Sequence, residues 1–273
     1  MKFTFLGTAA AEGFPAVFCN CEACNIARKL GGKNIRTRSQ SIINDDFLLD
    51  LSADTYMHFL NNGILGHKIK YLFVTHSHED HFYVDELQMR HGAFAHDMDV
   101  PVLNVYCSSG SYEKFHKQFE SIENIKVTLI KPYERIFAGE YEVIPLPARH
   151  FIGDDAVFYI IKHQDKTILY AHDTGYFYDE IFDYLEKEKP YFDFITFDCT
   201  NVALKFDDNS SHMGFDQIER VITHMVQLGC IDNKTKMYVN HFSHNGNCLQ
   251  EYVEKCAKPF GLKVAYDGLK VEI

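Results

Sequence analysis

Short apolar runs rich in β-branched and aromatic residues recur along the whole chain and alternate with amphipathic stretches. The apolar runs predict strands, and the amphipathic stretches predict helices that bury one face. Strands are predicted at residues 2–6, 40–51 (a pair), 69–74, 102–106, 126–130, 141–146, 156–162, 167–171, 192–197, 236–240, 262–265 and 269–273. Helices are predicted at residues 54–61, 84–95, 109–119, 179–189, 215–228 and 249–257. Many strands with interspersed helices, and no linker or break in composition, predict a single α/β domain over residues 1–273.

The composition supports a large buried core and limits the partners. Hydrophobic residues make up 46% of the 273 residues, and the formal net charge is −11. This charge argues against broad binding of nucleic acid or anionic membranes, and it favours small substrates over long RNA. No apolar run is long enough to span a bilayer, and residues 1–7 are too short and strand-like for a signal peptide. We therefore expect a cytoplasmic protein.

One polar segment, residues 75–81, concentrates side chains that can bind metal. It reads Thr-His-Ser-His-Glu-Asp-His and directly follows a predicted buried strand. His76 and His78 are two residues apart in an extended segment, so they point the same way and can hold one ion together. Asp80 and His81 lie past the bend, at the predicted start of a helix, and are aimed at a second position. The segment therefore predicts two metal ions rather than one.

Three more residues of ligand type each follow a β-rich run: His150, Asp173 and His241. A lone histidine at a strand end is usually structural, but together with residues 75–81 these three complete two coordination spheres. Asp173 is the natural bridge, because a carboxylate can hold one ion with each oxygen. The remaining ligands are assigned as His76, His78 and His150 to the first ion, and Asp80, His81 and His241 to the second.

Two neighbouring residues are expected to support these ligands. His172 precedes Asp173, so strand alternation turns it to the opposite face, where it would lie in the core or behind a ligand. Asp50 closes a predicted strand. It could cap local backbone or accept a hydrogen bond that orients a ligand histidine, and we favour the second role.

The order of these motifs resembles that of the metallo-β-lactamase fold hydrolases. The shared features are His-x-His-x-Asp-His, a later histidine, the aspartate of an Asp-Thr-Gly triplet and a final histidine, and they cover nearly the whole chain. The resemblance implies a metallo-β-lactamase-like αββα four-layer sandwich. It also implies that the metals, zinc or manganese, lie in a cleft at one edge of two packed sheets.

A second cluster, Cys19-x-Cys21-x-x-Cys24, offers three thiolates at the spacing of a metal clip. A structural zinc takes four ligands in a tetrahedron, and His244 is the candidate for the fourth. We call these four residues the cysteine clip; the alternative is a set of reduced surface thiols. A closed site of this kind would be structural and would tie the N-terminal loop to the segment that carries His241. The other five cysteines have no framework spacing, which favours free thiols in a reducing compartment.

The cysteine clip narrows the resemblance. Three cysteines after the first strand, with His-x-x-His near the end, are similar to the phosphonate-metabolism cyclic phosphodiesterase (PhnP) subgroup. The coenzyme PQQ biosynthesis protein B shares a similar cysteine cluster, and the tRNA-maturation ribonucleases share the hydrolytic core. The phosphodiesterase relatives imply a small phosphodiester or cyclic phosphate substrate, two divalent active-site ions and often a homodimer.

The resulting hypothesis is a binuclear metal-dependent phosphodiesterase, in which a hydroxide bridging the two ions attacks the phosphorus. Asp80 and Asp173 would position the ions and the water. The leaving alkoxide needs a proton, and His212 is our candidate for binding the substrate and supplying it. His212 lies in a loop before a predicted helix, where the alternative is a surface histidine near the helix N-terminus.

The residues leave other questions open. Arg36, Arg38 and Ser39 could contact a phosphate or could form a solvated basic loop. A hydrolase of thioesters, lactams or RNA on the same scaffold is one rival function, and a metal-binding protein like the PQQ-related branch is another. A redox di-iron protein is a third rival. It is disfavoured because the chain has no flavin or iron domain and because His78 stands where those relatives would carry a carboxylate.

Overall fold

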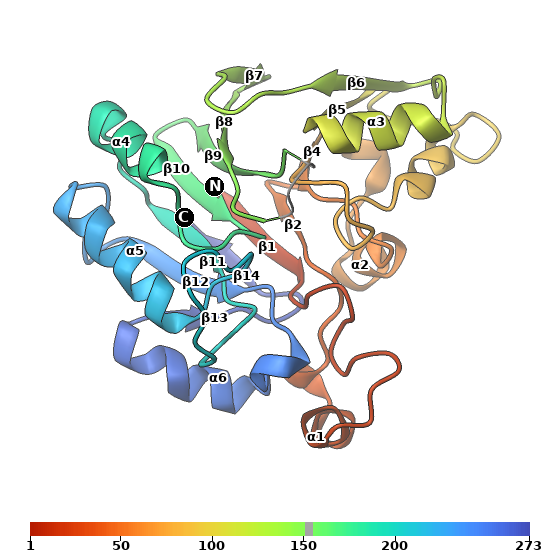
Figure 1. Ribbon diagram of the computed structural model, residues 1–273. Coiled ribbons are helices and arrows are strands. Elements are labelled where there is room, and N and C mark those ends of the chain that lie inside the picture. The colour runs from red at the N-terminus through yellow and green to blue at the C-terminus, as the bar shows by residue number, and fades with distance from the viewer. Residues whose placement is uncertain (151–154) are drawn as a thin grey trace.

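Two seven-stranded sheets form the centre of the protein, as the computed structural model shows for residues 1–150 and 155–273 (Figure 1). The strand order of the first sheet is β14-β1-β2-β3-β4-β5-β6, and that of the second is β13-β12-β11-β10-β9-β8-β7. The first sheet contains β1 (Lys2–Gly7), β2 (Gln40–Ile43), β3 (Phe47–Leu49), β4 (Tyr71–Val74), β5 (Leu103–Cys107), β6 (Ile125–Leu129) and β14 (Lys270–Glu272). The second contains β7 (Ile136–Ala138), β8 (Tyr141–Pro147), β9 (Val157–His163), β10 (Lys166–Ala171), β11 (Phe194–Asp198), β12 (Lys236–Asn240) and β13 (Lys263–Val264).

Helices cover the outer face of each sheet. Figure 1 shows α4, α5 and α6 on one side of the molecule and α2 and α3 on the other. The helices are α1 (Glu22–Leu30), α2 (Thr55–Asn62), α3 (Ser109–Gln118), α4 (Asp179–Glu188), α5 (Phe215–Gln227) and α6 (Gln250–Ala257). None of the helices in the described residues is long and apolar enough to cross a membrane.

Three apolar layers separate the four layers of secondary structure. Aromatic side chains from both sheets, among them Phe47 and Tyr170, fill the space between the sheets. Apolar residues of α4 and α5 pack on the second sheet, and Phe115 of α3 packs on the first. Side chains alternate along a strand, so a strand covered on both faces must be apolar on both. The predicted αββα four-layer sandwich is therefore confirmed.

The strand directions bring several loops to one edge of the sandwich. Strands β10, β11 and β12 run parallel to one another, so their carboxyl ends meet at the same edge of the second sheet. Asp173 follows β10, Asp198 ends β11, and His241 follows β12. In the first sheet, β4 leads into the segment at residues 75–81. The fold thus gathers the candidate ligands from distant parts of the chain.

Two local predictions are wrong. Asp80 and His81 do not begin a helix. They lie in a turn in which the carbonyl of His78 accepts hydrogen bonds from the amides of His81 and Phe82. The backbone then pairs with Leu51, whose amide donates to the His81 carbonyl at 2.7 Å, and this pairing prevents a helix from forming there. The helix expected at residues 84–95 is a 3-10 helix, η3 (Val84–Arg90).

Candidate active site

Three imidazoles from two loops face one another in the first predicted ligand set. His76 Nε2 lies 3.0 Å from His78 Nδ1, and His150 Nε2 lies 3.2 Å from the same His78 atom. A tetrahedral zinc ion with nitrogen ligands at about 2.0–2.1 Å holds those nitrogens about 3.3–3.4 Å apart. The three ring nitrogens therefore converge at the separation that a shared ion requires.

The second predicted ligand set is fully buried. His81 Nε2 lies 3.3 Å from Asp80 Oδ2 and 3.3 Å from His241 Nε2. His241 Nε2 in turn lies 2.9 Å from Asp173 Oδ1. The ligand atoms of Asp80, His81, Asp173 and His241 all lie within 4.8 Å of one another. This set also has the spacing of a single coordination sphere.

Asp173 joins the two sets. Its Oδ2 atom lies 3.5 Å from His76 Nε2 and 3.7 Å from His150 Nε2, both in the first set. The same oxygen lies 3.2 Å from His81 Nε2 in the second set. The other oxygen, Oδ1, is buried and makes no hydrogen bond of good geometry, although His241 is near. A buried carboxylate oxygen without a hydrogen bond is costly, so this donor set fits a pair of divalent ions.

Electrostatics keep the carboxylates ionised. Burial alone would raise the pKa of Asp80 and of Asp173, but the neighbouring His81 and His241 outweigh it and lower both well below the usual range. Burial, with His81 second, holds the pKa of His76 well below its ordinary value, so this ring stays neutral. Carboxylates and neutral imidazoles are the forms that bind metal ions.

His241 behaves differently from His76. Burial disfavours its cation, but Asp173 and Asp80 overcome this and raise the pKa of His241 to about 10. Burial also opposes the cation of His81, but Asp173 and Asp80 raise the pKa of His81 well above its ordinary value. Metal binding at this set is therefore expected to displace protons from both rings and to weaken as the pH falls.

The outer nitrogens of two ligand rings are held by fixed partners. His81 Nδ1 donates to Asp50 Oδ2 at 2.8 Å, and the other Asp50 oxygen accepts from the amide and hydroxyl of Thr75. Thr200 Oγ1 donates to the His241 carbonyl and accepts from His241 Nδ1, both at 2.8 Å. Such partners fix which ring nitrogen faces the ion. The expectation that Asp50 orients a ligand histidine is confirmed.

His172 is a core residue, as expected from strand alternation. It is fully buried, and its Nε2 lies 2.9 Å from Thr196 Oγ1 on the neighbouring strand. Its polar side-chain partners, Thr196 and Ser39, are not candidate ligands.

His212 lies against both ligand sets. Its ring packs edge-on against His150, with centroids 4.9 Å apart, and stacks on His241 at 5.5 Å. Its Nδ1 donates to Asp198 Oδ2 at 2.7 Å. Although burial opposes the cation, Asp198 raises the pKa of His212. The side chain is 22% exposed, so it lies at the mouth of the site rather than on the open surface.

Asp198 is a further candidate site residue, which the motifs in the sequence did not single out. It is fully buried at the carboxyl end of β11, and its Oδ1 accepts from the Thr200 amide at 2.9 Å. The available signal was a carboxylate directly after a predicted buried strand, which is the context of the other candidate ligands.

In the basic loop at residues 36–39, Arg36 and Ser39 fit neither of the two roles considered for it. Arg36 is 2% exposed and donates to Thr8 Oγ1, the Ala265 carbonyl and Gln250 Oε1. Arg38 pairs with Asp54, and Ser39 is buried beside His172. The loop folds onto the N-terminal and C-terminal segments, so a phosphate contact by Arg36 or Ser39 is ruled out.

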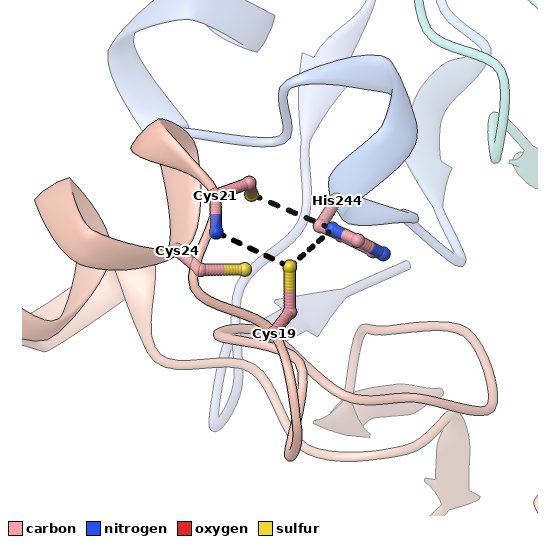
Figure 2. Close-up of side chains that lie close together, drawn as sticks. All are labelled: Cys19, Cys21, Cys24 and His244. Atoms are coloured by element: carbon pink, nitrogen blue, oxygen red, sulfur yellow. Dashed lines mark hydrogen bonds between the residues drawn. The ribbon is translucent and has the colours of Figure 1, made fainter.

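The four residues of the cysteine clip lie together. Figure 2 shows the thiols of Cys19, Cys21 and Cys24 gathered around the ring of His244. His244 Nδ1 lies 3.4 Å from Cys19 Sγ and 3.6 Å from Cys21 Sγ. A tetrahedral zinc ion with sulfur at about 2.3 Å and nitrogen at about 2.0–2.1 Å separates the two by about 3.6 Å. The clip has the donors and the spacing of a closed metal site.

The thiols of the clip differ in how readily they ionise. The contact with His244 lowers the pKa of Cys21 to about 6, so this thiol is largely a thiolate at neutral pH. Burial raises the pKa of Cys24 to about 11. Cys24 would therefore become a ligand only with a cation beside it.

Comparison with known proteins identifies the family. The family model described as beta-lactamase superfamily domain matches residues 47–241. No curated protein matches the chain. Solved structures similar over its whole length include the following three, all below 25% identity, so they bear on the fold alone. A diphosphatase from the PhnP family is 21% identical, with a TM-score of 0.73 and 97% of its own chain covered. The metallo-β-lactamase fold protein YhfI from Bacillus subtilis is 19% identical (TM-score 0.74, 99% covered). Zinc-bound PqqB from Methylobacterium extorquens is 17% identical (TM-score 0.74, 100% covered). The chain belongs to the β-lactamase superfamily and has the metallo-β-lactamase fold of a metal-dependent hydrolase.

Proposed function

We propose that this protein is a binuclear metal-dependent phosphodiesterase that hydrolyses a small phosphodiester or cyclic phosphate. The observation that carries the proposal is the position of the His212–Asp198 pair. This pair lies against one histidine of each ligand set, and the sets are joined by Asp173. A proton donor thus stands beside two metal positions, as cleavage of an ester of phosphoric acid requires.

The residues would hold two ions. His76, His78 and His150 would hold one, Asp80, His81 and His241 the other, and Asp173 would contact both. When bound, such ions neutralise charge on a phosphoryl group and make water nucleophilic at neutral pH. Imidazole and carboxylate ligands suit zinc or manganese.

His212 supplies the proton for the leaving group. Its Nδ1–H is fixed by Asp198, so Nε2 carries the proton that can be transferred. The raised pKa of His212 keeps the imidazolium populated at higher pH than for a free histidine. An alkoxide leaving a phosphodiester needs such a proton, whereas a thiolate leaving a thioester does not, because thiols are far more acidic than alcohols. The pair therefore favours an oxygen ester over a thioester.

Two further features support a small substrate. The net charge of −11 opposes binding of a long polyanion. The arginines of residues 36–39 are engaged within the fold, so they offer no basic track for a nucleic-acid backbone. The likeness to a PhnP-family diphosphatase agrees with a phosphate ester and adds a diphosphate linkage to the substrates worth testing.

For the cysteine clip we infer a structural zinc bound by Cys19, Cys21, Cys24 and His244. Four ligands leave no open position, so the role would be structural. The backbone of the neighbouring Phe242 pairs with the N-terminal loop at Thr8 and Ala10. Zinc in the clip would strengthen that connection and so help to fix the position of His241.

A substrate panel on the metal-loaded protein tests the proposed function. It contains bis(p-nitrophenyl) phosphate, a ribose 2′,3′-cyclic phosphate, a nucleoside diphosphate ester, S-lactoylglutathione, nitrocefin and a tRNA precursor. Turnover is expected on the phosphate esters, with about two equivalents of manganese or zinc bound besides the zinc of the clip. Preferred turnover of the thioester, lactam or tRNA precursor, or no turnover on any substrate, would refute the proposal.

A further inference from the structure

Lys114, on α3, lies against the segment that carries four of the candidate ligands. Its side chain is 20% exposed, and its ammonium group is close to three acceptors. It donates to the Ser77 carbonyl at 2.6 Å and to the Phe82 carbonyl at 2.8 Å, and it pairs with Glu79 Oε1 at 2.9 Å. An ammonium group has three hydrogens, so these partners use all of its donors.

The two carbonyls flank the ligands of the segment. Ser77 lies between His76 and His78, and Phe82 directly follows His81. The Lys114 ammonium group thus connects the part of the segment that belongs to the first ligand set with the part that belongs to the second. Phe82 is 0% exposed, so water cannot replace Lys114 as the partner of its carbonyl.

Other contacts hold the segment independently of Lys114. Asp50 binds Thr75 and His81, and Leu51 exchanges backbone hydrogen bonds with His81 and Tyr83. Together with Lys114, these contacts fix the segment at several points. Removing Lys114 would leave the contacts of Asp50 and Leu51 and would remove the hydrogen bonds from Lys114 to the carbonyls of Ser77 and Phe82.

We propose that Lys114 is a positioning residue that holds the His76–His78 pair and the Asp80–His81 pair at the mutual spacing needed to bind two ions. It does not touch the ions or the substrate. It acts through the backbone of the ligands, as supporting partners of metal ligands commonly do. This inference rests on the metal centre proposed above.

The test measures manganese binding rather than turnover. Mn²⁺ is added to metal-free protein and followed by electron paramagnetic resonance; this ion prefers imidazole and carboxylate over the thiolates of the cysteine clip. The variant Lys114→Met keeps the apolar stem and removes the donors. Lys117→Met, at an exposed lysine on the same helix, is the matched control. We expect Lys114→Met to bind Mn²⁺ about tenfold or more weakly and Lys117→Met to match the wild type.

The outcomes separate this inference from the proposed function. A wild-type protein that binds no Mn²⁺ would overturn the metal centre itself. A wild type that binds Mn²⁺, with equal affinity in Lys114→Met and Lys117→Met, would overturn only the role of Lys114. If Lys114→Met fails to fold, Lys114→Gln decides, because its shorter, neutral side chain cannot reach both carbonyls: weaker binding supports the role, and unchanged binding refutes it. Glu79→Gln should stay close to wild type, because the carbonyl contacts remain; a loss equal to that of Lys114→Met would contradict the proposed connection.

Discussion

Replacing His212 by alanine should lower turnover, and the loss should be largest for substrates with a basic leaving group that must be protonated. His212 contacts Asp198 and Thr200 through Nδ1 and packs against the rings of His150 and His241 without being one of the assigned ligands, so its loss is expected to leave the ligand sets in place. Asp198 keeps a partner, because the Thr200 amide donates to its Oδ1. The substitution therefore removes a proton donor without dismantling the metal positions.

The magnitude follows from the role. General acid catalysis contributes about 10²- to 10⁴-fold, which corresponds to about 3–5 kcal/mol of barrier. A ribose 2′,3′-cyclic phosphate expels an alkoxide and should lose all of this in His212→Ala. Bis(p-nitrophenyl) phosphate expels an acidic phenol that leaves as its anion, so its turnover should fall less than about tenfold, well under the full general-acid contribution.

The assay compares kcat for both substrates in the wild type, in His212→Ala and in His116→Ala, a control at an exposed histidine of α3. Metal content is measured on each preparation. An equal loss on both substrates, or unchanged turnover of the cyclic phosphate, would refute the assignment of His212 as the acid. A fall in bound metal would instead show that His212 supports the metal centre.

Four further outcomes are expected. Asp198→Asn should move the alkaline limb of the kcat/KM profile to lower pH, because the carboxylate that raises the pKa of His212 is lost and the imidazolium deprotonates earlier; an unmoved limb would contradict this. Mn²⁺ affinity should fall by about tenfold or more per pH unit on acidification below neutral, because the pKa of His81 and that of His241 are both raised and the ion displaces their protons; titrations at pH 6 and 7.5 measure this, and equal affinities would count against it. Cys21→Ser should remove one zinc equivalent and lower the melting temperature while Mn²⁺ binding persists; an unchanged zinc content would refute the zinc clip. Phe47→Ala should cost about 3–5 kcal/mol in urea unfolding, since Phe47 is fully buried and stacks on Phe73 at 4.8 Å; a cost below about 1 kcal/mol would contradict the central aromatic layer.

The sequence predicts which candidate ligands lie together, and there is a physical reason for this. Histidine and aspartate are costly directly after a buried strand unless something binds them, so their recurrence at strand ends is a strong signal. His150, Asp173 and His241 are found in this way although they are far apart in the chain. The same argument applied to Asp198 would have found the partner of His212, but a single carboxylate without a neighbouring histidine carries less weight.

Other features depend on tertiary contacts that no local pattern encodes. Arg36 looks like part of a solvated basic loop, yet acceptors from three distant segments bury it. Asp80 and His81 follow a strand and look like a helix start, but pairing with Leu51 keeps them in a turn. Lys114 lies on a helix with no distinctive motif, and only the fold brings it to the carbonyls of Ser77 and Phe82.

The backbone at the site shows how the fold delivers its ligands. Asp50, Asp173 and His241 all have positive φ, at 64°, 48° and 59°, and each lies just past the end of a strand. Left-handed backbone in a residue other than glycine costs about 1 kcal/mol or more, so it persists only where surrounding contacts impose it. Here the next residue is fixed in each case: the Leu51 amide donates to the His81 carbonyl, the Thr174 hydroxyl accepts from the Arg149 amide, and the Phe242 amide donates to the Thr8 carbonyl. The left-handed residue reverses the chain after each strand and turns its side chain toward the ligand sets. A backbone that continued straight would place these two carboxylates and the histidine beyond the site. The strain is therefore a consequence of bringing them to it.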